Sequence, residues 1–372
     1  RVKVLSEKLV AFRDSEGRPG LVDERCPHRN ASMFFGRNEE SGLRCVYHGW
    51  KFDIEGRCMD MPSEPPTSNF KNKVRLTAYP CIERGGLVWA YMGPEEHRPP
   101  FPDIEWTAVP ASHRFTTRHI QECNWFQAVE GGYDISHLHH LHRGAAKLKT
   151  HSTTFEFMRS DFGFIAGNGH EVPEGTTWVA SVFMMPFHKL IGRHFGPDAP
   201  IGAHVWVPID DENCMIYSVE YHPARPLNDK EMERSKNWDY IHAEVIPGTD
   251  RAVLNLDNDF NIDRELQKSG ASFTGLKGFG IQDCGIQETM GPIAERSRER
   301  LGKSDSIVIK LREGMLKLLE DHAAGKPLPG MNAASYRVRS AVFTAGDGES
   351  FAQFACDRVA GAAKAAAAKV LA

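Results

Sequence analysis

Short runs of alternating apolar and polar residues fill the first ninety or so positions of the chain. Such runs lie within residues 2–22, 43–54 and 73–91, and turn residues separate them, as at 15–17. An alternation with a period of two is typical of β-strands that bury one face, and the intervening turns favour antiparallel neighbours. Residues 1–93 are therefore predicted to form a small antiparallel β domain.

The stretch from 94 to 102 is the natural place for a domain boundary. It holds four prolines in nine residues, and such a run disfavours both helix and strand. A chain of 372 residues is also long enough for two domains. We therefore expect one domain at residues 1–98 and a second domain at residues 99–372.

The second part of the chain mixes strand-like runs with helix-like segments. Residues 154–221 hold several apolar runs separated by turn residues, which predicts an antiparallel sheet. Helices are predicted at 124–138, at 229–245 and from near Asp283 to beyond Arg296, and a last one after the capping pair Ser304-Asp305. The expected fold class is α+β: a small antiparallel β domain, then a larger catalytic domain whose antiparallel sheet is covered by helices.

The composition indicates which classes of partner and which cellular compartment to expect. The net charge is −4, so no basic surface favours nucleic acid, and no apolar run approaches the ~20 residues of a membrane helix. The eight cysteines lack the spacing of a disulfide framework, so we expect reduced thiols in a cytoplasmic protein. Because the first residue is Arg1 rather than Met, we expect an N-terminal segment to be missing from the sequence.

Two short motifs in the β domain carry two cysteines and two histidines. Cys26 and His28 form a C-x-H pair, and Cys45 and His48 form a C-x-x-H pair. Two thiolates can hold one iron, and two imidazoles the other iron, of a [2Fe–2S] cluster of the Rieske type. Zinc also accepts two cysteines and two histidines, but a zinc finger groups the two cysteines together and the two histidines together. Since each pair here has one of each, the sequence favours the [2Fe–2S] cluster.

A second candidate metal site lies in the larger domain. Four histidines occur within residues 137–142, and Asp134 precedes them. Two histidines and one carboxylate on one face of an iron leave positions open for O2. His137 and His140 share a helix face, whereas His137 and His142 are about 140° apart on a straight helix, so spacing alone leaves the pair open. Asp134 can reach the second ring nitrogen of His137, and metal-bound histidines usually have such a partner.

Together, the two motifs resemble the oxygenase α-subunit of the Rieske non-haem iron aromatic ring-hydroxylating enzymes, and the resemblance extends to residue 323. The similarity is to the phthalate 4,5-dioxygenase-like subgroup, which also includes O-demethylases of aromatic acids. The family's D-x-x-H-x(3,4)-H motif matches Asp134, His137 and His142, which implies that these two histidines are iron ligands. Residues 282–293 are similar to the segment that carries the third ligand, which implies Asp283 in that role.

Two further features of the sequence bear on the residues around the iron. Glu130 and Glu288 are chemically possible alternatives to Asp283 as the third ligand. Gly131-Gly132 departs from the family pattern, because many relatives have polar residues there. The departure leaves open which residue beside Asp134 would help to hold an iron-bound water.

The resemblance also implies a function. The chain would be the terminal oxygenase component of a multicomponent system, with a [2Fe–2S] cluster and Fe(II) as cofactors. It would take two electrons from an NAD(P)H-dependent flavin and iron–sulfur reductase and use O2 to hydroxylate a small aromatic acid, as in phthalate cis-dihydroxylation. Relatives form homotrimers or multiples of trimers, in which Asp134 would carry electrons from the cluster of one chain to the iron of its neighbour.

Two other functions stay open from the sequence. O-demethylation of a methoxylated aromatic acid would use the same metal sites, and residues 123–143 do not distinguish it from dihydroxylation. A non-catalytic Rieske electron carrier would need only the first domain, and the second metal motif argues against that function.

The substrate pocket is expected over the iron, between the strands at 155–219 and the glycine-rich segment at 270–280. The candidates for an apolar wall are Phe183, Met185 and Trp206. An aromatic carboxylate is best held by a cation. The first candidates for this cation are Lys189 and Arg193.

Overall fold

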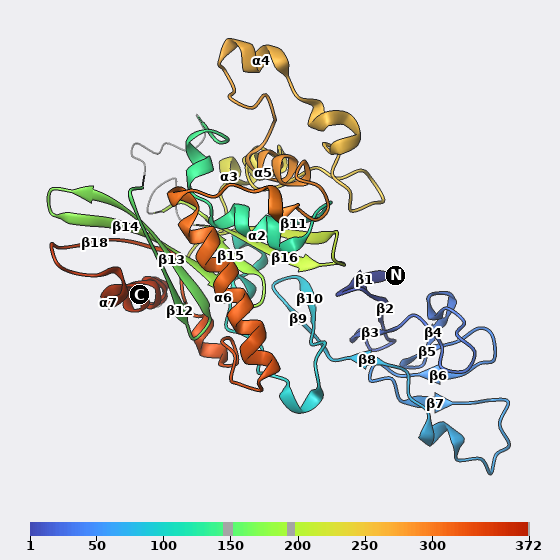
Figure 1. The fold of residues 1–372 in the computed structure, drawn as a ribbon. Coiled ribbons are helices and arrows are strands. Elements are labelled where there is room, and N and C mark those ends of the chain that lie inside the picture. Colours follow the sequence, from blue (N-terminus) through green and yellow to red (C-terminus); the bar gives the residue numbers. More distant parts are fainter. Residues whose placement is uncertain (144–151, 192–197, 371–372) are drawn as a thin grey trace. The chain divides into compact units, whose positions relative to one another are not determined.

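The structure of the chain, a computed structural model, describes residues 1–143, 152–191 and 198–370. These residues divide into two compact units, Arg1–Arg98 and Pro99–Ala372, and each unit is described by itself (Figure 1). The division falls within the proline-rich stretch at 94–102.

The first unit is built from short antiparallel strands. They form two four-stranded sheets, with the orders β1-β2-β3-β8 and β4-β5-β6-β7, and a separate hairpin, β9-β10. Val22, Met33 and Phe52 are fully buried in the core of this unit, and Cys26 and Cys45 belong to the same core cluster. Apolar packing therefore anchors the loops that carry the two cysteines. The strand bounds are β1 Val2–Val4, β2 Glu7–Arg13, β3 Pro19–Asp23, β4 Arg37–Glu39, β5 Gly42–Arg44, β6 Lys51–Phe52, β7 Cys58–Asp60, β8 Ala78–Tyr79, β9 Cys81–Arg84 and β10 Leu87–Ala90.

One antiparallel sheet of eight strands organises the second unit. The order is β11-β17-β16-β15-β14-β13-β12, and β18 also pairs with β14. The predicted antiparallel sheet is thus confirmed, and it gains β18, which the sequence pattern did not indicate. The strand bounds are β11 Arg114–Gln121, β12 Thr154–Ser160, β13 Gly163–Val172, β14 Gly175–Met184, β15 His188–Ile191, β16 Ile201–Pro208, β17 Cys214–Tyr221 and β18 Ala341–Ala345.

The helices of this unit are shorter than the sequence pattern predicts. The helix expected at 124–138 ends at Tyr133, and the one expected at 229–245 ends at Lys236. The helix expected from near Asp283 to beyond Arg296 begins at Phe279 and ends at Glu288. The last predicted helix follows Asp305, as expected. The bounds are α1 Glu105–Ala108, α2 Trp125–Tyr133, α3 Asp229–Lys236, α4 Arg264–Ser269, α5 Phe279–Glu288, α6 Ser306–Ala323 and α7 Phe351–Val370.

Helices cover both faces of the large sheet. Val129 of α2 and Leu311 of α6 share a buried cluster with Phe183 of β14, and α6 crosses the sheet (Figure 1). Trp178 of β14 points to the opposite face, because an odd number of positions separates it from Phe183. There it packs against Phe351 of α7, with ring centroids 4.9 Å apart. The α+β architecture expected from the sequence is confirmed.

A buried ion cluster joins α2 to α6. Glu130 of α2 is 7% exposed. Arg312 of α6 donates to its carboxylate at 2.7 and 2.9 Å, and Arg296 donates to it at 2.7 Å. Arg312 also donates to Glu299 at 2.6 Å. These contacts fix the end of α2, which leads directly into the segment with four histidines.

Candidate functional site

In the first unit, the loops after Cys26 and Cys45 have the same backbone hydrogen bonds. In each loop the cysteine N–H donates to the carbonyl five residues later, and the N–H four residues later donates back to the cysteine carbonyl. The distances are 2.9 and 2.9 Å for Cys26, and 2.8 and 2.9 Å for Cys45. The fourth residue of each loop, Asn30 or Gly49, is in the left-handed region, with φ of 60° and 77°. Two loops of similar backbone therefore each present one cysteine and one histidine.

The side chains of these loops pair thiol with thiol and imidazole with imidazole. Cys26 and Cys45 are 1% and 3% exposed, and they belong to the same buried cluster. The ring centroids of His28 and His48 are 4.4 Å apart, and Trp50 stacks on His28 at 4.3 Å. Two buried thiols beside two more accessible imidazoles fit a [2Fe–2S] cluster with one cysteine-bound and one histidine-bound iron.

Two backbone N–H groups of the first loop oppose the effect of burial on the Cys26 thiol. Burial raises the pKa of Cys26 to about 11, whereas hydrogen bonds from the backbone N–H groups of His28 and Arg29 lower this pKa. A metal ligand must be a thiolate. These two N–H groups are therefore the part of the loop that stabilises the metal-bound form.

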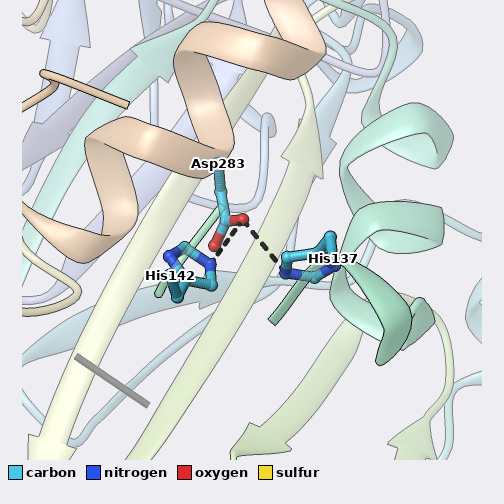
Figure 2. A group of neighbouring side chains, drawn as sticks. All are labelled: His137, His142 and Asp283. Carbon is cyan, nitrogen blue, oxygen red and sulfur yellow. Dashed lines mark hydrogen bonds and ion pairs between the residues drawn. The ribbon is translucent and has the colours of Figure 1, made fainter. Parts of the chain in front are cut away.

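The second unit brings His137, His142 and Asp283 together. One donor atom from each lies within 4.8 Å of the others. Asp283 Oδ1 is 3.4 Å from His137 Nε2 and 3.0 Å from His142 Nε2, and Figure 2 shows the carboxylate between the two rings. Two imidazole nitrogens and one carboxylate oxygen that face a common point fit a mononuclear non-haem iron with open positions.

A break after α2 allows the two histidines to converge. Asp134 has an extended backbone with φ −68° and ψ 112°, which ends the helix at Tyr133. A short 3-10 turn, Ser136–His139, then replaces the predicted continuation of the helix. On a straight helix, His137 and His142 would point in different directions. The altered path after Asp134 removes that restriction.

Each of the two histidines has an acceptor on its other ring nitrogen. Asp134 Oδ2 lies 3.4 Å from His137 Nδ1, and Gln282 Oε1 lies 2.8 Å from His142 Nδ1. With Nδ1 donating, each Nε2 keeps the lone pair that binds a metal. The sequence indicates Asp134 at this place, but it does not indicate Gln282, which directly precedes Asp283.

The two aspartates are held in their ionised form. Burial opposes ionisation of Asp283, but its close contact with His142 and the nearby His137 keep its pKa below the usual range. Burial also opposes ionisation of Asp134, yet hydrogen bonds from His137 and Ser136 lower its pKa. An ionised carboxylate is the form that binds a metal, so Asp283 is suited to that role.

The alternative ligands Glu130 and Glu288 lie outside this group of three. The two arginines described above bind the carboxylate of Glu130. Glu288 is 5% exposed and accepts a hydrogen bond from the N–H of Glu122 at 3.1 Å. Burial raises the pKa of Glu288 to about 7. Among the described residues, no ion pair or hydrogen bond joins Glu130 or Glu288 to the imidazoles of His137 and His142, whereas Asp283 lies close to both rings.

A cavity of about 80 Å³ lies beside the three residues, lined by α2, α5 and the strands from β11 to β17 except β12. Lys189 and Trp206 line it. Phe183, which was expected in the pocket wall, lies in the hydrophobic core instead, and Met185 packs against that core; neither is among the described residues that line this cavity. Phe183 is fully buried beneath Tyr133, with ring centroids 5.8 Å apart. Arg193 lies outside the described residues.

Two glycines of α2 shape this cavity. A Cβ on Gly131 would lie 2.1 Å from Gln287 Nε2, and a Cβ on Gly132 would lie 2.8 Å from the ring of Trp206 and 3.3 Å from Lys189 Cδ. Larger residues would therefore displace these three side chains. Because α2 lies so close to these side chains, residues 131 and 132 must be small, which explains the departure from the family pattern.

Lys189 places a positive charge in the cavity. Its Nζ lies 4.9 Å from the ring centroid of Tyr133. Within the described residues it forms no ion pair or hydrogen bond, and no other Lys or Arg lines the cavity. Burial lowers the pKa of Lys189 to about 8, while Asp283 and Asp134 act in the opposite direction. A partly buried cation without an anionic partner is costly, so the cavity is suited to an anionic ligand.

Comparison with known families finds a match within each of the two units. Residues 1–79 match the Rieske [2Fe-2S] domain, and residues 175–345 match the "LigXa C-terminal domain like" family. The chain is 37% identical over 369 residues to the phthalate 4,5-dioxygenase oxygenase subunit of Pseudomonas putida, covering 93% of this chain and 82% of that protein. The chain belongs to the Rieske aromatic-ring oxygenases.

Further relatives of this Rieske oxygenase differ in their reactions. The 3-chlorobenzoate-3,4-dioxygenase oxygenase subunit of Comamonas testosteroni is 36% identical, covering 88% of this chain and 81% of the relative. The 5,5'-dehydrodivanillate O-demethylase oxygenase subunit of Sphingobium sp. is 30% identical, covering 87% and 72%. A solved structure, dicamba monooxygenase bound to dicamba, shares the fold, with a TM-score of 0.57 at 17% identity over 87% of this chain and 93% of that one.

Membership of this family defines the role of the chain. It is the terminal oxygenase component of a multicomponent system, with a [2Fe–2S] cluster and Fe(II) as cofactors, and it acts with a separate reductase. Within the part of the chain that the structure describes, no helix has the length and apolar character needed to cross a membrane.

The loop geometry predicts the effect of Gly49→Ala. A Cβ at this left-handed position would lie 2.6 Å from Pro62 Cγ, so we expect the second loop to lose about 1–3 kcal/mol of stability. The purified variant should then contain less cluster per chain, measured by its visible absorbance against protein concentration. Asn30→Gly is the matched control, because glycine suits the equivalent position of the first loop. Equal loading in the two variants would contradict the prediction.

Proposed function

We propose that His137, His142 and Asp283 hold the Fe(II), and that Cys26, His28, Cys45 and His48 hold the [2Fe–2S] cluster. The observation that carries the first assignment is the approach of Asp283 Oδ1 to both imidazole Nε2 atoms, at 3.4 and 3.0 Å. The iron supplies the activation of O2 in this family. Asp134 and Gln282 orient the two imidazoles so that their Nε2 atoms face Asp283.

The proposed substrate is a small aromatic carboxylate, held by Lys189. Its carboxylate would neutralise the unpaired ammonium, and the ring would lie against Trp206 and the aliphatic side chains of Ile191 and Ile216, which also line the cavity. The phthalate and chlorobenzoate dioxygenase relatives support this substrate class. The reaction we favour is phthalate-like cis-dihydroxylation with O2 and two electrons from an NAD(P)H-dependent reductase.

O-demethylation of a methoxylated aromatic acid is the second candidate reaction. The O-demethylase relative, at 30% identity, supports it, and the same metal centre and cation would serve it. In both reactions, Lys189 would place the ring and α2 would cover one of its sides. The two candidates differ in the product and not in the residues that hold the substrate.

Electron transfer between chains is a further part of the proposal. In a homotrimer, Asp134 would link a cluster histidine of one chain to His137 of its neighbour, because its carboxylate already lies 3.4 Å from His137 Nδ1. A cytoplasmic location belongs to the same proposal, since none of the eight cysteines forms a disulfide, as is usual in a reducing compartment.

The iron assignment predicts that His142→Ala loses the mononuclear iron and keeps the cluster. The variant should contain two irons per chain instead of three and retain its visible absorption, measured by elemental analysis and absorbance. His140→Ala is the control, because His140 is exposed and lies outside the group of three. Loss of the visible absorption in His142→Ala would refute the division into two centres.

The bridging role predicts that Asp134→Asn keeps both metals and lowers turnover by about 100-fold, the upper end of effects seen when a ligand's partner is removed. Turnover should be measured as substrate-dependent O2 consumption with a surrogate reductase, alongside the iron content. Ser136→Ala removes one hydrogen bond to the same carboxylate and serves as the milder control. Coupled activity near that of the unaltered protein in Asp134→Asn would exclude the bridge.

The two candidate reactions are distinguished by their products. Dihydroxylation of a benzoate-type acid predicts a cis-diol that contains both atoms of O2 and no formaldehyde. Mass spectrometry and a formaldehyde assay with phthalate and with methoxybenzoates measure both. Formaldehyde in stoichiometric amounts from a methoxybenzoate would favour O-demethylation over our first choice.

A further inference from the structure

Two buried carboxamides form a pair at the end of the cavity next to α5. Gln121 of β11 is fully buried, and Gln287 of α5 is 7% exposed. Gln121 Nε2 donates to Gln287 Oε1 at 2.7 Å. Both residues line the cavity, and the function described above does not use them.

This pair keeps unused hydrogen-bonding capacity. Gln121 Oε1 is buried without a partner, and within the described residues nothing accepts from Gln287 Nε2. Buried polar groups in proteins are nearly always bonded, and an exception calls for an explanation. One carbonyl oxygen and one amide NH2 group therefore remain for a ligand.

The kinds of hydrogen-bonding group left for a ligand are the same if the oxygen and nitrogen of both carboxamides are exchanged. If both side chains were rotated by 180°, Gln287 would donate to Gln121, and the free groups would be the nitrogen of Gln121 and the oxygen of Gln287. In both arrangements, one N–H···O bond between two carboxamides leaves one whole carbonyl oxygen and one whole NH2 group without a partner in the pair. The complementary ligand group must donate one hydrogen bond and accept another.

The pair is held firmly in place. Cys284 Sγ and His119 Nε2 are 3.5 Å apart, and His119 precedes Gln121 by two positions on β11. This is a second contact between β11 and α5, next to the hydrogen bond between Gln121 and Gln287. Gln287 also follows Asp283 by one helical turn, so both side chains leave the same face of α5.

The pair also lies within reach of the proposed carboxylate anchor. Gln287 Nε2 fills the space beside Gly131, and the aliphatic part of Lys189 passes beside Gly132. Consecutive Cα atoms are about 3.8 Å apart. One substituted benzene ring can therefore reach both Lys189 and the carboxamide pair.

We propose that Gln121 and Gln287 form a hydroxyl-binding subsite, and that the substrate is an aromatic monocarboxylate with a hydroxyl group on the ring. The inference rests on the proposed function, since it takes Lys189 as the anchor for the carboxylate. A hydroxyl can donate to one carboxamide and accept from the other. A second carboxylate, a methoxy group or a chlorine can only accept, and would leave the free carbonyl oxygen unpaired.

The test is the direct binding of aromatic acids to the oxidised holoenzyme, without reductase, by isothermal titration calorimetry. The probes are benzoate, the three monohydroxybenzoates, the three monomethoxybenzoates and phthalate. We expect one hydroxybenzoate to bind at least about tenfold more tightly than benzoate, phthalate and its own methoxy analogue. Gln287→Leu and Gln121→Leu should each reduce this advantage to within about twofold, while the affinity for benzoate stays the same.

Lys189→Met is the matched control, and iron content is measured for every variant because α5 also carries Asp283. This control should weaken all the acids by a similar factor and keep the advantage of the hydroxyl group. The proposal is overturned if no hydroxybenzoate binds more tightly than benzoate or phthalate. It is also overturned if both leucine variants keep the advantage, or if they weaken benzoate as much as hydroxybenzoate. An unchanged affinity in Lys189→Met would refute the anchor alone, so the two failures are distinguishable.

Discussion

The contact of one carboxylate with two imidazoles is the constraint on which the second unit depends. Asp283 lies 3.4 Å from His137 Nε2 and 3.0 Å from His142 Nε2, although 141 positions separate it from His142. With Nδ1 donating on each ring, the two Nε2 lone pairs and the carboxylate are all acceptors, so at such distances they need a cation between them. The break after α2, the partner Gln282 and the contacts of α5 with β11 all serve to hold this arrangement.

The cavity beside this contact is polar where a sheet face would ordinarily be apolar. Lys189 and His204 are neighbours on β15 and β16, and His204 bonds to Ser218 on β17 at 3.2 Å. Burial of such groups reduces stability unless a partner compensates. Aromatic packing of α2 and α6 on the rest of that face surrounds the polar strip. We infer that stability is given up here to create a site for a charged, ring-shaped ligand.

Much of the fold and both candidate centres could be predicted from the sequence, because metal ligands come in short motifs and strands alternate. What could not be predicted depends on contacts distant in sequence. The apolar spacing of 124–138 is that of one helix, and only the tertiary path ends it at Tyr133. Phe183 and Lys189 both lie on the inner face of the sheet, but Tyr133 covers the first and leaves the second in the cavity. Nothing in the sequence pattern indicates that the side chain of Gln287 lies beside Gly131 and lines the cavity.

The most direct test of this account is a crystal structure of the iron-loaded protein with anomalous diffraction data at the iron absorption edge. The account predicts a pair of iron atoms between Cys26, His28, Cys45 and His48, and a single iron bound by His137, His142 and Asp283. Mononuclear iron bound at Glu130 or Glu288 would contradict it. So would an ordered His137–His142–Asp283 group without iron in a fully loaded and active sample.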